Sequence, residues 1–354
     1  MSVYVIAEAG VNHNGELALA HRLIDAAADA GADAVKFQTF VPELLASSQA
    51  RRAAYQERNQ PGEDSQLAML QKLALSFGDH FELLAHCGER GIEFLSSPFD
   101  HQSADFLLNT LQLPRLKLGS GELTNAPLLW QLARSGRELI LSTGMASLDE
   151  IRQALGLVCL AFADPAEQPP RYDFADCFEP GLLQGRLSLL HCTTEYPCPL
   201  DAVNLRAMDQ LGETFGLPVG YSDHTQGINV SIAAAARGAR IIEKHFTLDR
   251  SLPGPDHPAS LEPHELTAMV QGIREVSQAL GSTRKQPAQV ELGNAAVARK
   301  SLCAAVAIKK GEIFSAQNLC SKRPGTGLSP MHYWSLLGTS AARDYAADEP
   351  IDAE

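Results

Sequence analysis

The chain has 354 residues, of which 45% are hydrophobic and 20% are charged, a balance that excludes a disordered chain and is typical of a soluble globular enzyme. Its 29 basic and 42 acidic residues give a net charge of −13, which opposes binding to nucleic acid or to an anionic membrane. The N-terminus has no basic leader, no apolar run reaches the about 18 residues that span a bilayer, and the seven cysteines form no CxxC pair. We therefore expect a reduced, cytoplasmic protein.

Short apolar runs that end in polar residues recur along the first 280 residues, each followed by a helical pattern. Eight of these runs are predicted strands, at residues 4–10, 34–40, 92–99, 115–122, 138–144, 186–194, 218–224 and 240–248. Helical spacing begins at residues 17–32 and ends with a final helix at 262–281. Eight buried strands that alternate with helices predict a closed parallel barrel over residues 1–280, with an open doubly wound sheet as the alternative.

Two long segments interrupt this alternation, at residues 41–66 and 161–185. The first follows a strand, so it should lie at the end of the barrel where active sites are built, and it is a candidate lid. The second follows a helix and should lie at the opposite end.

The C-terminal part has a different pattern. Residues 281–295 are polar and contain Gly281 and Pro287, which predicts a linker. Residues 296–354 alternate apolar and polar side chains between turn signals, which predicts a small β-rich domain. A module of this size is small for independent stability, so we expect it to dock on another surface.

Polar residues end all eight predicted strands, which packing alone does not explain. In a (β/α) barrel, catalytic residues come from these C-terminal strand ends. The candidates from the strand ends are Glu8, Lys36, Gln38, Ser97, Lys117, Ser120, Glu122, Ser142, Tyr196, Ser222, His224, Glu243 and His245.

Lys36 and Lys117 project from buried strands, where an unpaired ammonium group is costly. Glu8, Glu122 and Glu243 are potential partners. Alternatively, the lysines and the strand-end serines hold a phosphorylated or carboxylated ligand through charge-assisted hydrogen bonds. The two interpretations are compatible.

His224 and His245 end neighbouring strands and could share a divalent cation, whose other ligands would be water and substrate oxygen. The alternative is that both are ordinary hydrogen-bonded histidines. Asp256 lies in a Pro- and Gly-rich loop that suits either a polyol or a solvated turn. Arg323 precedes a Pro-Gly turn, and by itself this position indicates only surface charge.

Ten motifs in this order resemble the sialic acid synthase family over nearly the whole chain. They are IAEAGVNHNG, VKFQTF, SSPFD, KLGSGE, LSTGM, LHCTTEYP, GYSDHT, IEKHFTLD, PGPDH and KRPGTGLSP. The resemblance implies a (β/α)8 TIM barrel followed by an antifreeze-like (SAF) domain. It also implies condensation of phosphoenolpyruvate with N-acetylmannosamine and water to N-acetylneuraminic acid and phosphate.

The resemblance also assigns roles to individual residues. The positions that match phosphoenolpyruvate ligands are Lys36, Ser97, Lys117, Ser120, Ser142 and Ser222, and those that match sugar ligands are Gln38, Glu122, Tyr196 and Asp256. Glu8 matches an acid/base near the reacting carbons. His224 and His245 match the ligands of a catalytic divalent metal, manganese in the first instance, with magnesium or cobalt as alternatives. Arg323 would reach the sugar site of the partner subunit, which implies a homodimer with exchanged C-terminal domains.

Other functions remain open. Within the family, the alternative product is N,N'-diacetyllegionaminic acid, made from 2,4-diacetamido-2,4,6-trideoxymannose by the same chemistry, and a third possibility is a phosphorylated amino sugar. From another class, the chain could be a catalytically silent sugar-binding protein. The intact lysines and histidines argue against that alternative. Thr194 stands where some relatives have an asparagine, so one ligand contact differs.

Overall fold

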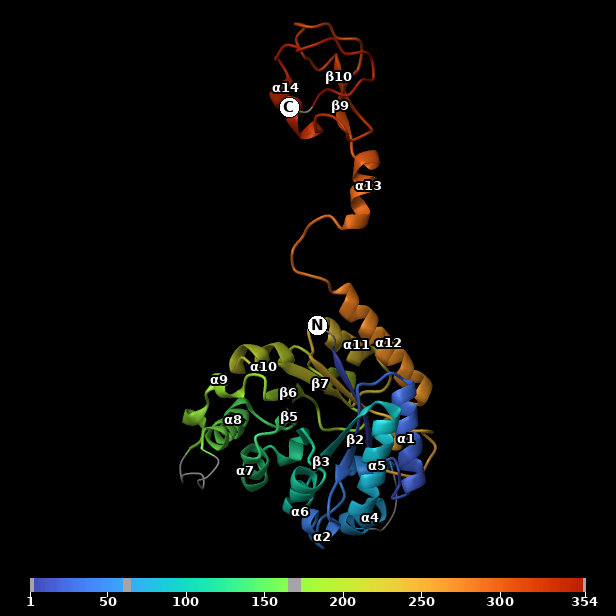
Figure 1. Cartoon of the computed structure of the whole chain (residues 1–354), viewed down its shortest axis with the longest axis vertical. Coiled ribbons are helices and arrows are strands. Elements are labelled where there is room, and N and C mark those ends of the chain that lie inside the picture. Colours follow the sequence, from blue (N-terminus) through green and yellow to red (C-terminus); the bar gives the residue numbers. More distant parts are fainter. Residues whose placement is uncertain (1–2, 60–64, 165–172, 353–354) are drawn as a thin grey trace. The chain divides into compact units, whose positions relative to one another are not determined.

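The computed structural model describes residues 3–59, 65–164 and 173–352 (Figure 1). The chain divides into two compact units, Met1–Gly281 and Ser282–Glu354. Each unit has its own hydrophobic core.

Eight parallel strands form the sheet of the first unit, and each lies within one of the predicted runs. They are β1 (Tyr4–Gly10), β2 (Ala34–Thr39), β3 (Glu93–Pro98), β4 (Arg115–Leu118), β5 (Glu138–Ser142), β6 (Leu187–His191), β7 (Val219–Asp223) and β8 (Ile241–His245). The order β3-β2-β1-β8-β7-β6-β5-β4 brings the first strand against the eighth, and the end strands β3 and β4 contact each other. The predicted barrel is confirmed.

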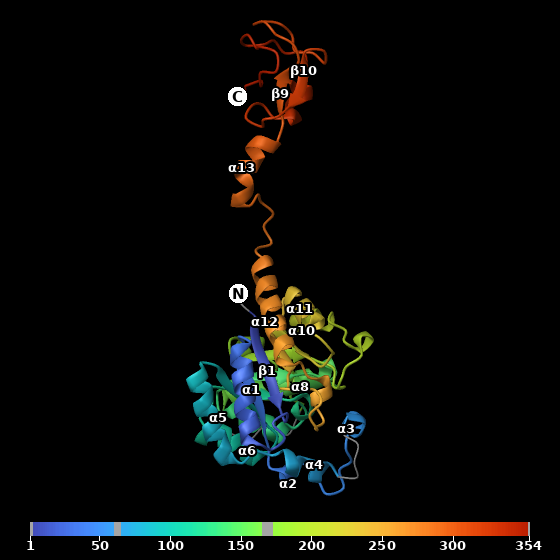
Figure 2. The ribbon, with the colours of Figure 1, turned by 90° about the vertical axis from the view of Figure 1, so that its right-hand side faces the viewer.

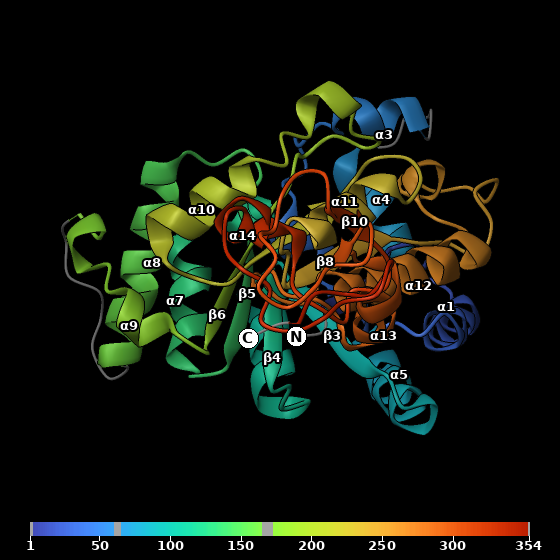
Figure 3. The same ribbon diagram turned by 90° about the horizontal axis from the view of Figure 1, so that it is seen from above.

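Helices cover the outside of these strands, as Figure 3 shows from above. They are α1 (Leu17–Asp29), α5 (Phe77–Arg90), α6 (His101–Asp105), which a π-helical turn extends (Phe106–Thr110), α7 (Ala126–Arg134), α8 (Leu148–Ala163), α10 (Ala207–Phe215), α11 (Asn229–Ala236) and α12 (Pro263–Ala279). Figure 2 shows α1 and α12 next to β1, where the last helix packs against the first.

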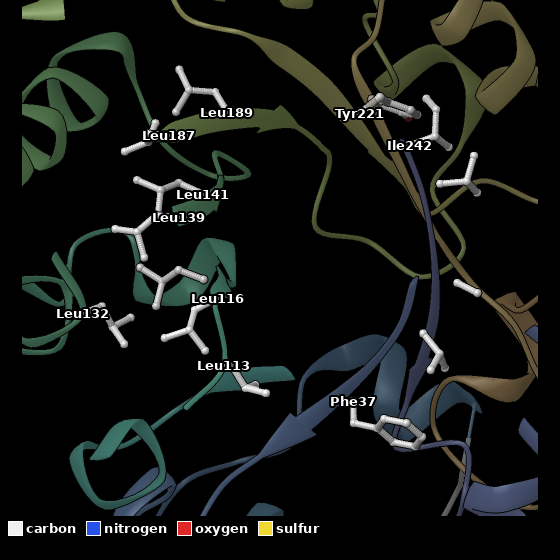
Figure 4. Packing of buried hydrophobic residues seen from close by; sticks show 14 of the residues in the cluster. Phe37, Leu113, Leu116, Leu132, Leu139, Leu141, Leu187, Leu189, Tyr221 and Ile242 are labelled. Atoms are coloured by element: carbon white, nitrogen blue, oxygen red, sulfur yellow. The ribbon is translucent and has the colours of Figure 1, made fainter. Parts of the chain in front are cut away.

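Side chains along each strand of the barrel alternate between two hydrophobic clusters. On β5, Leu139 and Leu141 belong to the large cluster between the strands and the surrounding helices, part of which Figure 4 shows. Ile140, between them, belongs to a separate buried cluster inside the barrel. That cluster consists of Ile6, Ala34, Leu95, Ile140, Leu190 and Ile241. Since successive side chains of a strand point to opposite faces, this inner layer fixes which later residues also point inward.

The segment after β2 is helical. It holds α2 (Pro42–Leu45) and α3 (Ala54–Asn59), and α4 (Gln66–Leu73) follows it; residues 60–64 of the candidate lid lie outside the described part. Its apolar side chains form a small core with the strand ends, in which Met69, Leu70 and Leu73 pack with Val11 and Phe40. The second long segment contains a 3₁₀ turn (Ala175–Cys177) and α9 (Pro180–Leu183), and its residues 165–172 are not described.

The second unit is small and β-rich, as predicted. β9 (Ser301–Ala304) pairs antiparallel with β10 (Leu319–Lys322), and a 3₁₀ turn (Pro330–His332) leads into α14 (Tyr333–Leu336). Part of the segment expected to be a linker is helical, since α13 spans Gln289–Ala298. Within the described ranges, no helix combines the length and the apolar character needed to cross a bilayer.

Candidate active site

A polar layer lies directly above the apolar layer inside the barrel. Two residues beyond Ile6, Ala34, Leu95, Ile140 and Ile241, the same inward face carries polar side chains. These are Glu8, Lys36, Ser97, Ser142 and Glu243, all of them buried. Because side chains alternate between the two faces of a strand, these five residues from separate strands lie together on the inner face of the barrel.

This layer forms the floor of a pocket of about 360 Å³. Every predicted site residue of the first unit lines it: Glu8, Lys36, Gln38, Ser97, Lys117, Ser120, Glu122, Ser142, Tyr196, Ser222, His224, His245 and Asp256. The structure thus brings these residues together, as the strand-end argument predicts. Arg323 belongs to the second unit, where it is exposed and its Nε donates a hydrogen bond to the Ala298 carbonyl over 2.9 Å.

The two buried lysines are paired with carboxylates. Lys36 forms an ion pair with Glu8, and its Nζ lies 3.6 Å from Glu243 Oε2. Lys117 Nζ lies 3.0 Å from Glu243 Oε1, which also accepts a hydrogen bond of 2.8 Å from Ser222. Glu243 therefore bridges both ammonium groups. The third proposed partner, Glu122, accepts a hydrogen bond from Asn125 over 2.7 Å.

The two carboxylates respond differently to this environment. Burial raises the pKa of Glu8 to about 7, because desolvation outweighs the attraction of Lys36. Burial also opposes ionisation of Glu243, but Lys117 and Lys36 outweigh it and hold the pKa of Glu243 at about 2. Glu243 is thus the permanent anion of the network, while Glu8 is the carboxylate that protonates more readily.

His224 directly follows β7 and His245 ends β8, and both line the pocket. Their ring centroids lie 5.9 Å apart, and the Tyr196 ring packs against both, at 4.1 Å from His224 and 5.6 Å from His245. His224 Nδ1 lies 2.6 Å from the Thr193 carbonyl, a contact in which the nitrogen must donate, so Nε2 keeps its lone pair. Burial lowers the pKa of His224 to about 4 and that of His245 well below its usual range, so both rings are neutral at pH 7.

Several hydroxyl groups in the pocket are available to a ligand. Among the described residues, Ser142 Oγ and Thr194 Oγ1 are buried without a hydrogen-bond partner. Ser120 Oγ accepts a hydrogen bond of 2.9 Å from the Gly144 N–H. A Cβ on Gly144 would lie 2.5 Å from Thr194 Oγ1 and 2.8 Å from Ser120 Oγ, so only glycine keeps these hydroxyls accessible.

The pocket wall contains residues that strand-end reasoning missed. Tyr55 of α3 packs on Tyr196 with ring centroids 4.8 Å apart, and next to them Asp256 is buried, which raises its pKa to about 6. Asn59 donates to the Pro255 carbonyl over 2.9 Å, and Arg58 pairs with Glu195 at 2.7 Å. Helix α3 is therefore held across the loops that follow β6 and β8.

One side of the pocket is apolar. Its residues come mainly from α2 and α4, which strand-end reasoning did not include: Val11, Leu45, Met69, Leu70, Leu73 and Phe99, here called the apolar wall. The only sequence signal for it was the unusual length of the segment after β2. The lysines and histidines lie on the strands, so the pocket has a charged floor and an apolar wall.

The chain matches the family model described as NeuB family over residues 23–285 and the SAF domain over residues 299–354. It is 48% identical to the N,N'-diacetyllegionaminic acid synthase of Campylobacter jejuni subsp. jejuni serotype O:2, over 98% of each chain. The enzyme of the same name from Legionella pneumophila subsp. pneumophila is 44% identical, over 98% of this chain and 92% of the relative. A crystal structure of N-acetylneuraminic acid (sialic acid) synthetase from Leptospira borgpetersenii serovar Hardjo-bovis, in complex with citrate, superposes with a TM-score of 0.67 at 32% identity, covering 83% of this chain and 90% of the other.

Proposed function

Because this chain belongs to the NeuB family and ends in a SAF domain, we propose that it is a phosphoenolpyruvate-dependent nonulosonic acid synthase whose product is N,N'-diacetyllegionaminic acid. The observation that carries this proposal is the pocket, in which paired lysines, free hydroxyls and two neutral histidines converge above a closed barrel core.

Phosphoenolpyruvate carries a carboxylate and a phosphate, and the floor of the pocket is suited to both. Lys36 and Lys117 supply positive charge from opposite sides of Glu243. The unpartnered Ser142 hydroxyl and the hydroxyls of Ser97 and Ser120 are within the same pocket and supply neutral donors, whereas Ser222 already donates its proton to Glu243. Ammonium and hydroxyl groups around an anion provide the charge-assisted hydrogen bonds that hold it in one orientation.

The residues present fit a divalent cation at His224 and His245. His245 Nδ1 is buried without a partner among the described residues, and His224 is oriented through Nδ1 by a backbone carbonyl, as metal-binding histidines commonly are. No cluster of three or more such side chains exists in the described part of the chain, so the remaining ligands would be oxygens of substrate and water. When bound, such a cation would polarise the sugar aldehyde as a Lewis acid.

The proposed reaction joins the methylene carbon of phosphoenolpyruvate to the aldehyde carbon of the sugar. Water adds to the neighbouring carbon, and the bond between that carbon and the phosphate oxygen breaks, releasing phosphate. The attacking water loses both protons as its oxygen becomes the new carbonyl oxygen: one goes to the aldehyde oxygen and the other to the departing phosphate. Glu8 lies in the polar layer between Lys36 and His245 and is our candidate for these proton transfers.

The identity of the sugar rests on the relatives and on the apolar wall. N-acetylmannosamine is the substrate that the sequence motifs favour, but two relatives at 48% and 44% identity are N,N'-diacetyllegionaminic acid synthases, which favours the alternative. The diacetamido-trideoxy sugar presents two more methyl groups than N-acetylmannosamine, at C6 and on the second acetamido group. An apolar wall binds such groups better than hydroxyls, with about 0.8 kcal/mol gained per buried CH₂.

Arg323 lies in the second unit, where its side chain is exposed. We propose that it completes the sugar site of a second copy, in a homodimer with exchanged C-terminal domains. This proposal rests on the match of residues 299–354 to the SAF domain and on the exposure of the arginine.

The test is phosphate release from phosphoenolpyruvate by the purified full-length chain with Mn²⁺. Three sugars are compared side by side: the diacetamido-trideoxy sugar, N-acetylmannosamine and its 6-phosphate. We expect release only when an amino sugar is present, and the highest kcat/KM with the diacetamido sugar. Release with none of them would refute the synthase, whereas a preference for N-acetylmannosamine would refute only the product assignment.

A further inference from the structure

Another buried ion pair lies behind the pocket. Asp223 of β7 and Lys244 of β8 are direct cross-strand neighbours, and Lys244 Nζ lies 3.1 Å from Asp223 Oδ2. Both side chains are 0% exposed. Neither is among the residues that line the pocket in the described part of the chain, because alternation along the strands points them outward, away from Ser222 and Glu243.

The pair is the centre of a fully hydrogen-bonded network. Asp223 Oδ1 accepts hydrogen bonds of 2.8 Å from both the backbone N–H and the hydroxyl of Thr225, and Oδ2 accepts one of 2.6 Å from Ser231 on α11. Lys244 also donates to the Thr225 carbonyl. One network therefore joins β7, β8, the loop after β7 and helix α11; β7 and α11 are labelled in Figure 1 and β8 in Figure 3.

This network holds the backbone next to both pocket histidines. His224 lies between Asp223 and Thr225, so both of its chain neighbours are held by the network. His245 directly follows Lys244. The polar contacts thus fix the backbone on both sides of one imidazole and immediately before the other.

Stability alone does not account for a charged pair at this place. Removing two charges from water costs several kcal/mol per ion, and well-packed apolar residues of similar volume usually give equal or greater stability. Apolar residues, however, cannot bind the N–H and the carbonyl of Thr225 in fixed directions. The ion pair instead fixes the distance between the ends of β7 and β8 and the conformation of the loop after β7.

We propose that Asp223 and Lys244 are positioning residues that hold His224 and His245 at the separation needed to share a divalent cation. The inference rests on the two-histidine site of the proposed function. It assigns a role to two residues that touch neither reactant.

The test is a neutral double variant, Asp223→Asn with Lys244→Met, which leaves no uncompensated buried charge. The probe is Mn²⁺ alone, titrated into the full-length protein by calorimetry. We expect the Kd for Mn²⁺ to rise tenfold to a hundredfold, the size of effect that outer-sphere partners of metal ligands have. Ser231→Ala, a milder change that removes one hydrogen bond to Asp223, should raise the Kd by a smaller factor.

The control is Arg115 and Glu138, a partly exposed pair of cross-strand neighbours on β4 and β5 with an ion pair of 2.9 Å at the opposite end of the strands. Arg115→Met with Glu138→Gln should lower the thermal midpoint without changing the Kd for Mn²⁺. A wild-type Kd in the Asp223/Lys244 variant would overturn the positioning role. If that variant does not fold, an unchanged Kd in Ser231→Ala overturns it instead.

The outcome also separates this inference from the metal site itself. If the wild-type protein binds no Mn²⁺, the two-histidine site and the positioning role fail together. If His224→Ala abolishes binding while the double variant binds normally, only the positioning role fails.

Discussion

Glu8 on β1 and Lys36 on β2 stand directly opposite each other in the parallel ladder and form a buried ion pair on the floor of the pocket. His245 is the ladder neighbour of Glu8 on the other side. One carboxylate therefore lies between the proposed phosphoenolpyruvate site and the proposed metal site, where the carbon–carbon bond would form.

Glu8→Gln should lower kcat by at least about a hundredfold, because a proton donor and acceptor is lost from the reacting centre. The fold should persist, since Lys36 keeps Glu243 at 3.6 Å and Ser97 at 3.3 Å as partners. Steady-state phosphate release and circular dichroism measure the two effects. A kcat within a few-fold of the wild-type value would remove Glu8 from the mechanism.

His224→Ala and His245→Ala should each abolish Mn²⁺ binding and phosphate release while leaving a folded protein, because a two-ligand site cannot lose one ligand. Calorimetric titration with Mn²⁺ measures the first effect. His264→Ala is the control, since that side chain is 76% exposed at the start of α12. Normal metal binding by either pocket variant would contradict the ligand assignment.

Leu70→Gln should lower the preference for the diacetamido-trideoxy sugar over N-acetylmannosamine by about tenfold in kcat/KM, because methyl groups would then face an amide. The control is Leu75→Gln. Leu70 and Leu75 are each 8% exposed, but Leu75 packs in the core between strands and helices and not on the pocket. An equal loss of selectivity in both variants would mean that general destabilisation, and not the apolar wall, is responsible.

Arg323→Ala subunits mixed with His224→Ala subunits should recover part of the activity that each lacks alone. In an exchanged dimer, one of the two sites in a mixed dimer has an intact barrel and an intact arginine. Phosphate release before and after mixing and re-equilibration measures the recovery. Mixed dimers that form but stay inactive would argue against exchange.

The thermal midpoint should fall as the pH is lowered from 6.5 to 4. Burial lowers the pKa of His257 to about 4, so over this range the unfolded chain binds a proton that the folded chain does not, and acid favours unfolding. The contribution of neutral His257 to the free energy of unfolding is complete above pH 6.5 and is lost as the pH approaches 4. In His257→Gln the fall should be shallower, and scanning calorimetry at several pH values measures it. An unchanged slope would show that the imidazole does not titrate as described.

The strands and their polar ends could be predicted because both depend on short-range patterns. Ile6 and Glu8, or Ile140 and Ser142, are two residues apart, so the period of a strand suffices to place them on one face. The same reasoning predicted that Lys36 and Lys117 need carboxylate partners, but not that Glu243 serves both.

Contacts between distant segments could not be predicted in this way. Leu70 reaches the pocket because α4 packs on Val11 and Phe40, and Tyr55 reaches it because α3 contacts the loops after β6 and β8; no local pattern encodes either contact. The pairing of Asp223 with Lys244 requires the register of β7 against β8. The role proposed for Arg323 would involve a second subunit, which no local pattern in one chain can show.

The apolar layer of Ile6, Ala34, Leu95, Ile140, Leu190 and Ile241 also has a kinetic consequence. It fills the barrel below the polar floor, so we expect reactants to enter and leave the pocket at the side where the strands end. In the proposed assignment, phosphoenolpyruvate binds to Lys36 and Lys117 at the bottom of the pocket. It must therefore enter before the sugar occupies the space above it. We therefore expect ordered binding, with phosphoenolpyruvate first. Sugar that binds first should form a dead-end complex and inhibit turnover.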